Sequence, residues 1–201
     1  MTRSLRIAVA DDEPRMRDYF RKILPRLGHQ VVAVAETGRQ LVDRCRELHP
    51  DLVITDINMP DLDGIDAANQ IYQEDTVPVI LVSAYHDVEL IKRAEADHIL
   101  AYLIKPIKQA DLEVAIGIAM RRFEQFEALR QEAADLRQAL EDRKVIERAK
   151  GILMKKAGLD EHDAFRRLQK LASERNRKLV EIAQMILTAE EALQAPNKPT
   201  V

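Results

Sequence analysis

The sequence predicts an α/β protein: a five-stranded parallel sheet with helices wound on both faces, followed by a coiled-coil helix and a small three-helix bundle. Two observations carry this prediction. Over the first 120 residues, short apolar runs alternate with amphipathic stretches, which is typical of parallel strands buried on both faces. Beyond residue 120, apolar residues recur only at helical spacing.

Five short apolar runs, mostly rich in Val and Ile, predict the strands. They span residues 5–10, 31–35, 52–54, 79–82 and 99–104. Between them, apolar residues recur at helix spacing from Met16 to Leu27, and Gly28 follows where a C-terminal cap belongs. A second stripe runs from Leu41 to Leu48. Such β–α repeats in series imply a parallel sheet over residues 1–120.

The fifth helix should begin near Lys108, and it shows no stop signal. Residues 121–142 carry an a/d seam of two to three heptads, which fails where Arg143 takes the next seam position. The seam consists of Phe126, Leu129, Ala133, Leu136 and Leu140. A single helix packed along its own domain would explain this stripe. We favour a coiled coil that joins two copies in a homodimer, because little other chain could cover it.

Residues 143–190 carry three further helical stripes and should fold as one bundle. The first stripe closes near Gly158, Asp160 is a good N-cap for the second helix, and the third begins at Leu179. Residues 191–201 include two prolines and are expected to form a disordered tail.

Charge is distributed unevenly. Residues 1–120 hold 14 Lys or Arg against 20 Asp or Glu, whereas residues 143–178 hold 12 against 5. A basic block on an acidic chain indicates an acidic partner. The single cysteine, Cys45, allows no internal disulfide and fits a reducing, cytoplasmic setting. We expect no signal peptide and no membrane segment, since no apolar run approaches the roughly 20 residues that cross a bilayer.

Polar side chains follow four of the predicted strands. Asp11 and Asp12 end the first strand, and Asp56 ends the third. Ser83 and Lys105 end the fourth and fifth. In a parallel sheet these ends meet at one edge, where three crowded carboxylates call for a cation such as Mg²⁺.

This set suits phosphoryl transfer. Asp56 is central and is the expected nucleophile, while Mg²⁺, the Lys105 ammonium and the Ser83 hydroxyl would neutralise the phosphoryl oxygens. An Asp-Asp pair alone is usually a solvated turn or a helix cap, and a lone Lys-Pro is usually a loop. The specific signal is the joint pattern on successive strand ends.

Residues 1–120 resemble a response-regulator receiver domain. The resemblance rests on four segments: A-D-D-E-P (10–14), D-I-N-M-P-D-L-D-G (56–64), V-S-A (82–84) and Y-L-I-K-P (102–106). It implies a flavodoxin-like fold and phosphorylation of Asp56 by a histidine kinase. It also implies that Mg²⁺ is bound by Asp12, Asp56 and the Asn58 backbone carbonyl, with Asp11 acting through water.

The same resemblance implies roles for four more residues. Ser83 and Lys105 would hold the phosphoryl oxygens, and Tyr102 would be the switch aromatic. The Lys105–Pro106 bond would be cis, and Gly64 would adopt a backbone conformation closed to other residues.

Residues 143–190 resemble the ANTAR domain, which binds RNA and regulates transcription by antitermination. The most specific segment is A-K-G-I-L-M (149–154). The expected RNA is a set of structured leader hairpins, and the excess of cations suits its phosphates. The expected RNA contacts are Arg148, Ala149, Lys150, Gly151, Lys155, Arg166, Gln169, Lys170, Ser173, Arg175, Arg177 and Lys178. Cations on exposed helices are also commonly a solvated face.

Two other functions fit parts of the pattern. The helical output could bind DNA or a protein instead, but a helix-turn-helix would concentrate its basic residues on the last helix. A phosphatase-like enzyme would turn over small esters, yet nothing indicates a second base. We therefore expect no enzyme activity beyond the receiver's own phosphoryl transfer and dephosphorylation.

Overall fold

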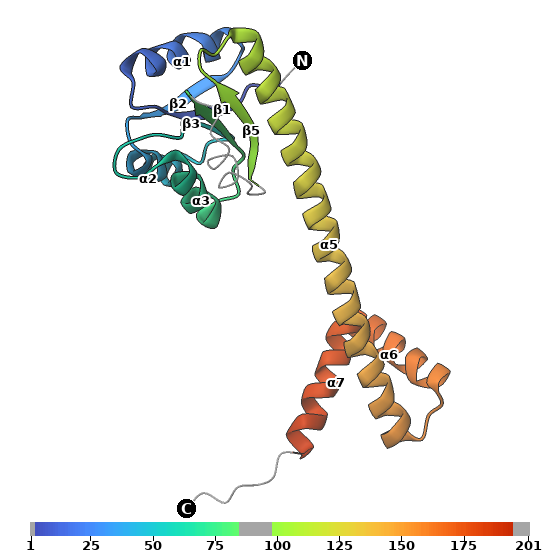
Figure 1. Cartoon of the computed structure of the whole chain (residues 1–201). Coiled ribbons are helices and arrows are strands. Elements are labelled where there is room, and N and C mark those ends of the chain that lie inside the picture. The colour runs from blue at the N-terminus through green and yellow to red at the C-terminus, as the bar shows by residue number, and fades with distance from the viewer. Residues whose placement is uncertain (1–2, 85–97, 195–201) are drawn as a thin grey trace, which may run out of the picture. The chain divides into compact units, whose positions relative to one another are not determined.

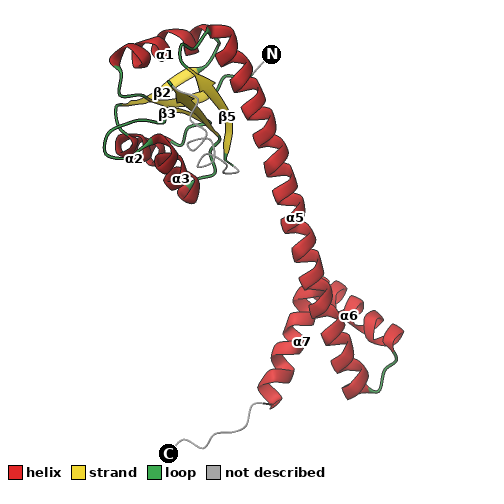
Figure 2. Ribbon diagram, in the orientation of Figure 1, coloured by secondary structure: helices red, strands yellow, loops and turns green. Residues whose placement is uncertain are grey.

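The computed structural model describes residues 3–84 and 98–194. The chain forms two compact units, Met1–Ala128 and Leu129–Val201. Figures 1 and 2 show the first unit as a sheet with helices on its faces, and the second as helices only. No helix within the described ranges is long and apolar enough to cross a membrane.

The first unit contains a five-stranded parallel sheet, as predicted. The strands are β1 (Arg6–Ala10), β2 (Gln30–Ala35), β3 (Leu52–Asp56), β4 (Val79–Ser83) and β5 (Ile99–Ile104). Their order in the sheet is β2-β1-β3-β4-β5, and every neighbouring pair is parallel. The central strands β3 and β4 are buried along their whole length, which explains their continuous apolar sequences.

Helices cover both faces of this sheet (Figure 1). They are α1 (Pro14–Arg26), α2 (Gly38–Leu48), α3 (Gly64–Glu74) and the first turns of α5 (Gln109–Ala157). One core contains the apolar sides of α2 and α3, and the other contains those of α1 and α5. The doubly wound fold is thereby confirmed. The fourth helix of the β–α series is expected between β4 and β5, in residues 85–97 that lie outside the described ranges.

Local signals in the first unit behave as expected. Gly28 follows α1 with a φ of 86°, a left-handed conformation that suits glycine. Cys45 lies on the buried side of α2 with 4% of its surface exposed, and burial raises the pKa of its thiol to about 12. A buried thiol of this kind behaves as a small apolar side chain.

Helix α5 is one continuous helix from Gln109 to Ala157, so the expected linker and the first helix of the bundle are a single element. Along the predicted seam, the side chains of Leu129, Leu136 and Leu140 are 66%, 60% and 60% exposed. Such exposure fits a surface that a second chain covers, but the coiled coil itself stays a prediction.

The second unit is completed by α6 (Glu161–Arg175) and α7 (Leu179–Gln194). Its buried core consists of Ala149, Leu168, Ile182 and Ala183. Asp160 caps α6 as predicted, since its side chain accepts a hydrogen bond from the Asp163 N–H at 2.8 Å.

The predicted start of the tail at residue 191 is wrong. Helix α7 continues to Gln194, because Glu191, Ala192, Leu193 and Gln194 are all good helix formers. Residues 195–201 lie outside the described ranges.

Candidate functional site

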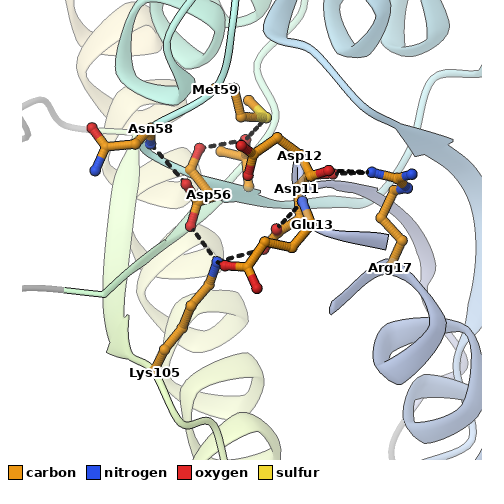
Figure 3. Close-up of polar contacts among 9 residues, drawn as sticks. Asp11, Asp12, Glu13, Arg17, Asp56, Asn58, Met59 and Lys105 are labelled. Carbon is orange, nitrogen blue, oxygen red and sulfur yellow. Dashed lines mark hydrogen bonds and ion pairs between the residues drawn. The ribbon is translucent and has the colours of Figure 1, made fainter. Parts of the chain in front are cut away.

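The carboxyl ends of the strands bring two of the predicted acidic residues, Asp11 and Asp56, to one ammonium group (Figure 3). Lys105 follows β5, and its Nζ lies 2.8 Å from Asp56 Oδ1 and 2.9 Å from Asp11 Oδ2. The backbone joins the same strands, since the Lys105 N–H donates to the Ser83 carbonyl at 2.8 Å. Parallel pairing thus assembles residues that are up to 94 positions apart in the sequence, from Asp11 to Lys105.

Burial separates these acids into two kinds. Asp11 is fully buried and Asp56 is 4% exposed, whereas Asp12 and Glu13 are exposed. Backbone N–H groups hold the buried carboxylates in place: Glu13 N donates to Asp11 Oδ1 at 2.9 Å, and Asn58 N donates to Asp56 Oδ2 at 2.8 Å. Such donors fix the direction in which a carboxylate presents its remaining lone pairs.

Burial also controls the proton affinities. It raises the pKa of Asp56 and of Asp11, and in each case it outweighs the opposing effect of the Lys105 ammonium. For Lys105, burial alone would lower the pKa, but the bonds to Asp56 and Asp11 together raise it. The site therefore holds a permanently charged ammonium between two carboxylates that are costly to keep ionised.

Glu13 joins the site without having been predicted. Its Oε1 lies 3.2 Å from Lys105 Nζ, so it is a third carboxylate at that ammonium. It directly follows the Asp11–Asp12 pair in the sequence, and that adjacency was the available signal. Asp11, Asp12 and Glu13 each offer a carboxylate oxygen, and these oxygens lie within 4.8 Å of one another.

These oxygen donors fit a hard divalent cation. Mg²⁺ prefers carboxylate, carbonyl and water oxygens. Asp11 is buried whereas Asp12 and Glu13 are exposed, so a cation at these carboxylates could keep some of its bound waters. The resemblance to receiver domains implies an acidic Mg²⁺ pocket of this type. Two observations support a Mg²⁺ site here: the donors are all carboxylate oxygens, and the Asp11 carboxylate is buried.

The other predicted residues of this site lie close by. Ser83 is 1% exposed at the end of β4, directly after Val82, which pairs with Asp56 in the sheet. Tyr102 is half-buried on β5 and packs against the core beneath α2 and α3. The Lys105–Pro106 bond is cis, as the resemblance implied.

The expected role of Gly64 needs correction. Its φ is not positive, so no special backbone conformation requires glycine there. A Cβ at residue 64 would instead overlap the Asp56 backbone carbonyl. Glycine is needed because the start of α3 passes directly against the residue that carries the carboxylate.

In the second unit, ten of the twelve predicted RNA contacts are exposed. They are Arg148, Gly151, Lys155, Arg166, Gln169, Lys170, Ser173, Arg175, Arg177 and Lys178. A groove of about 340 Å³ lies between α5 and α7 and is lined by Arg148, Gly151 and Lys155. Lys156 lines it too and was missed, as were Glu190 and Glu191 on its opposite wall.

The other two predicted contacts, Ala149 and Lys150, are buried. Ala149 is fully buried in the core of the helical unit. Lys150 is also buried: its Nζ lies 2.9 Å from Glu147 Oε2 and 2.8 Å from Glu161 Oε1, and 5.9 Å from the centre of the Phe165 ring. Ala149 packs with residues of α6 and α7, and Lys150 links α5 to α6, so neither side chain is exposed to a ligand in this conformation.

Comparison with known proteins identifies both halves of the chain. Residues 7–117 match the response regulator receiver domain, and residues 134–187 match the ANTAR domain. The chain belongs to the response regulator family, with an ANTAR domain as its output. Receiver domains are phosphorylated by histidine kinases, and ANTAR domains bind RNA.

Individual relatives agree with this assignment. The chain is 39% identical over 193 residues to the transcriptional regulatory protein PdtaR of Mycobacterium tuberculosis, covering 96% of this chain and 92% of PdtaR. It is 35% identical to HptR of Staphylococcus aureus over 58% of this chain and 46% of HptR. A receiver domain protein from Clostridium thermocellum superposes with a TM-score of 0.55 at 28% identity, covering 60% of this chain and 98% of that one.

Proposed function

We propose that Asp56 accepts a phosphoryl group from a histidine kinase and that this modification controls RNA binding by the helical unit, with transcription antitermination as the outcome. The observation that carries the proposal is the Lys105 ammonium, held within 3 Å of both Asp56 and Asp11. A fixed positive charge beside the acceptor is what a phosphoryl group with developing negative charge requires.

In the proposed reaction, an Asp56 carboxylate oxygen attacks phosphorus, and the bond from phosphorus to the donor's imidazole nitrogen breaks. Lys105 and Ser83 stabilise the oxygens of the transferred group. Asp11, Asp12, Asp56 and the Asn58 carbonyl would hold Mg²⁺, which supplies further charge neutralisation when bound. Asn58 N and Lys105 orient the two Asp56 oxygens before the donor arrives.

The product is an acyl phosphate on Asp56, which water cleaves to restore the carboxylate. The proposed catalysis is therefore confined to the protein's own modification and its reversal. A phosphatase-like enzyme would release phosphate repeatedly from small esters, whereas this reaction modifies each chain once per cycle.

RNA binding is supported by the excess of cations in residues 143–178 and by the exposed positions that eleven of these twelve cations occupy. The seam on α5 supports a homodimer, since its leucines are exposed. Two ANTAR domains in one dimer could engage two hairpins at once and gain affinity by avidity.

Labelling with a phosphodonor tests the acceptor. The wild-type chain should be modified once, and Asp56→Asn should not be labelled. Asp51→Asn is a matched control, because Asp51 precedes β3 at the opposite end of the strand and should be labelled as the wild type is. Labelling of Asp56→Asn would show that another residue is the acceptor.

A binding assay tests the output. Intact protein is titrated with a two-hairpin RNA and with duplex DNA of equal length, each with and without beryllofluoride as a phosphoryl mimic. Tighter RNA binding with the mimic supports both the output and its control. If the protein prefers DNA, or binds neither nucleic acid, the proposed RNA-binding function is contradicted. The proposal that Asp56 is the phosphoacceptor is not affected by that result.

A further inference from the structure

We propose that Arg17 is a positioning residue of the acidic site: its buried guanidinium holds the backbone turn that carries Asp11 and Asp12, and so determines how their carboxylates meet a divalent cation. The inference rests on the proposed phosphoacceptor function and extends it to a residue outside the acidic cluster.

The geometry of Arg17 is unusual for an arginine on a surface helix. Its Nη1 donates to the backbone carbonyls of Asp11 and Asp12, each at 2.8 Å. Its Nη2 lies 2.7 Å from Glu36 Oε1. Only 10% of the side chain is exposed. Figure 3 shows the guanidinium on the far side of the aspartate turn from Lys105.

These three contacts join three elements. Arg17 lies in the first turns of α1, the two carbonyls belong to the turn between β1 and α1, and Glu36 directly follows β2. The backbone supports the same junction, since Asp11 N donates to the Ala35 carbonyl at 3.3 Å. One guanidinium therefore fixes the end of β1 relative to its neighbouring strand and helix.

Fixing the carbonyls also fixes the carboxylates. Only three residues separate the end of β1 at Ala10 from the start of α1 at Pro14, so the turn has few free torsions. Within it, Glu13 N holds Asp11 Oδ1 at 2.9 Å. If the carbonyls of Asp11 and Asp12 rotate, the Asp11 hydrogen bond and the direction of the Asp12 side chain change with them. Partners of this supporting type commonly change metal affinity by about 10- to 100-fold.

Arginine is suited to this task in a way that lysine is not. Its planar group presents several N–H donors in fixed directions, so that one side of the fork reaches two carbonyls while the other reaches a carboxylate. Lysine keeps the charge but not the directions. A role through geometry therefore predicts that Arg17→Lys fails to restore function, whereas a role through charge alone predicts that it succeeds.

The test uses the full-length protein and Mg²⁺ as the probe. Calorimetric titration should show Mg²⁺ binding about tenfold weaker in Arg17→Met and nearly as weak in Arg17→Lys. Arg15→Met removes the same charge from an exposed position on the same helix and should stay within about twofold of wild type. In backbone NMR spectra without Mg²⁺, the Glu13 amide should shift more than amides of the central sheet.

Phosphorylation kinetics give a second readout. The Mg²⁺ concentration for half-maximal labelling should rise about tenfold in Arg17→Met, while the rate at saturating Mg²⁺ should approach that of wild type. A variant that is merely damaged in its fold would bind Mg²⁺ more weakly and would also be labelled more slowly at saturating Mg²⁺. If Arg17→Met does not fold, Glu36→Gln replaces it, because that change removes the ion pair and keeps the two carbonyl bonds. It should weaken Mg²⁺ binding about two- to threefold.

The proposal is overturned if Arg17→Met binds Mg²⁺ as tightly as wild type, or if Arg17→Lys fully restores Mg²⁺ binding. If Arg17→Met is unfolded, wild-type Mg²⁺ affinity in Glu36→Gln overturns it instead. A wild-type chain that neither binds Mg²⁺ nor accepts a phosphoryl group would instead overturn the phosphoacceptor function itself. The two failures are thus distinguished by the wild-type measurement.

Discussion

Each of the two units contains a buried lysine that is paired with acids, and the burial of those acids differs between the two lysines. Lys105 and Lys150 have side chains only 14% and 8% exposed. Two of the three acidic partners of Lys105, Asp11 and Asp56, are buried, and burial raises their pKa values; the third, Glu13, is 58% exposed. The partners of Lys150, Glu147 and Glu161, are 54% and 73% exposed.

The proton affinities show the contrast. The pKa of Glu161 is lowered by the hydrogen bond that Glu161 makes with Lys150, as in an ordinary solvated ion pair. At Lys105 the carboxylates carry an uncompensated desolvation cost, which a further cation or a phosphoryl group can relieve. The burial of the acids, more than that of the lysine, therefore distinguishes a reactive site from a structural contact.

The largest effect should follow from Lys105→Ala. Removing the ammonium takes away a fixed charge at the position where phosphoryl charge develops, so labelling by a phosphodonor should fall about 10²- to 10³-fold. Lys108→Ala, at an exposed position three residues later, should label normally. Labelling of a folded Lys105→Ala within a few-fold of wild type would place the necessary charge elsewhere.

Two glycines extend the comparison to the backbone. Gly64→Ala should lower the free energy of unfolding by about 1–3 kcal/mol or more, because its Cβ meets the Asp56 carbonyl. Gly151→Ala should raise it by about 0.5–1 kcal/mol, since the position lies in a helix and faces open space. Urea denaturation of both variants measures the free energy of unfolding. Equal changes in this free energy for the two variants would contradict the close packing at Gly64.

Lys150→Met should act on stability and not on phosphorylation. The change removes the contacts with Glu147, Glu161 and Phe165, which link α5 to α6, while both glutamates remain in water. Thermal unfolding followed by circular dichroism should show a lower transition temperature. Lys170→Met, which breaks an exposed pair with Glu174, should change it less. Loss of Asp56 labelling in Lys150→Met would contradict the separation of roles.

The smallest effect concerns His29, which is 9% exposed and whose Nδ1 lies 3.3 Å from Leu5 N. Burial lowers its pKa against the opposing influence of Glu113. The unfolded chain then binds more protons near its usual pKa of about 6.5, so the free energy of unfolding should fall as pH drops through that value. His29→Gln should flatten this dependence, which urea denaturation at several pH values measures.

Sequence patterns predicted most of the fold because periodicity and burial agree in the sheet. The strand ends also identified Asp11, Asp56, Ser83 and Lys105, since parallel topology fixes where such ends meet. The patterns did not predict that Lys150 is buried, because charged residues on a helix are ordinarily assigned to its wet face.

Arg17 and Glu13 were missed for a related reason. Glu13 lies in the three-residue turn and Arg17 in the first turns of α1. The contacts of both depend on side-chain direction, and periodicity carries no information on direction. Gly64 was predicted to matter, but the cause is a contact with Asp56 from a different element, which local sequence does not reveal.

The burial of Cys45 has a consequence for the kinds of signal that the protein can receive. Burial raises the pKa of the thiol to about 12, so the protonated thiol strongly predominates at pH 7. Peroxide, disulfide exchange and glutathione all act through the thiolate. The single cysteine of the chain is therefore a poor target for these reagents while the first unit stays folded.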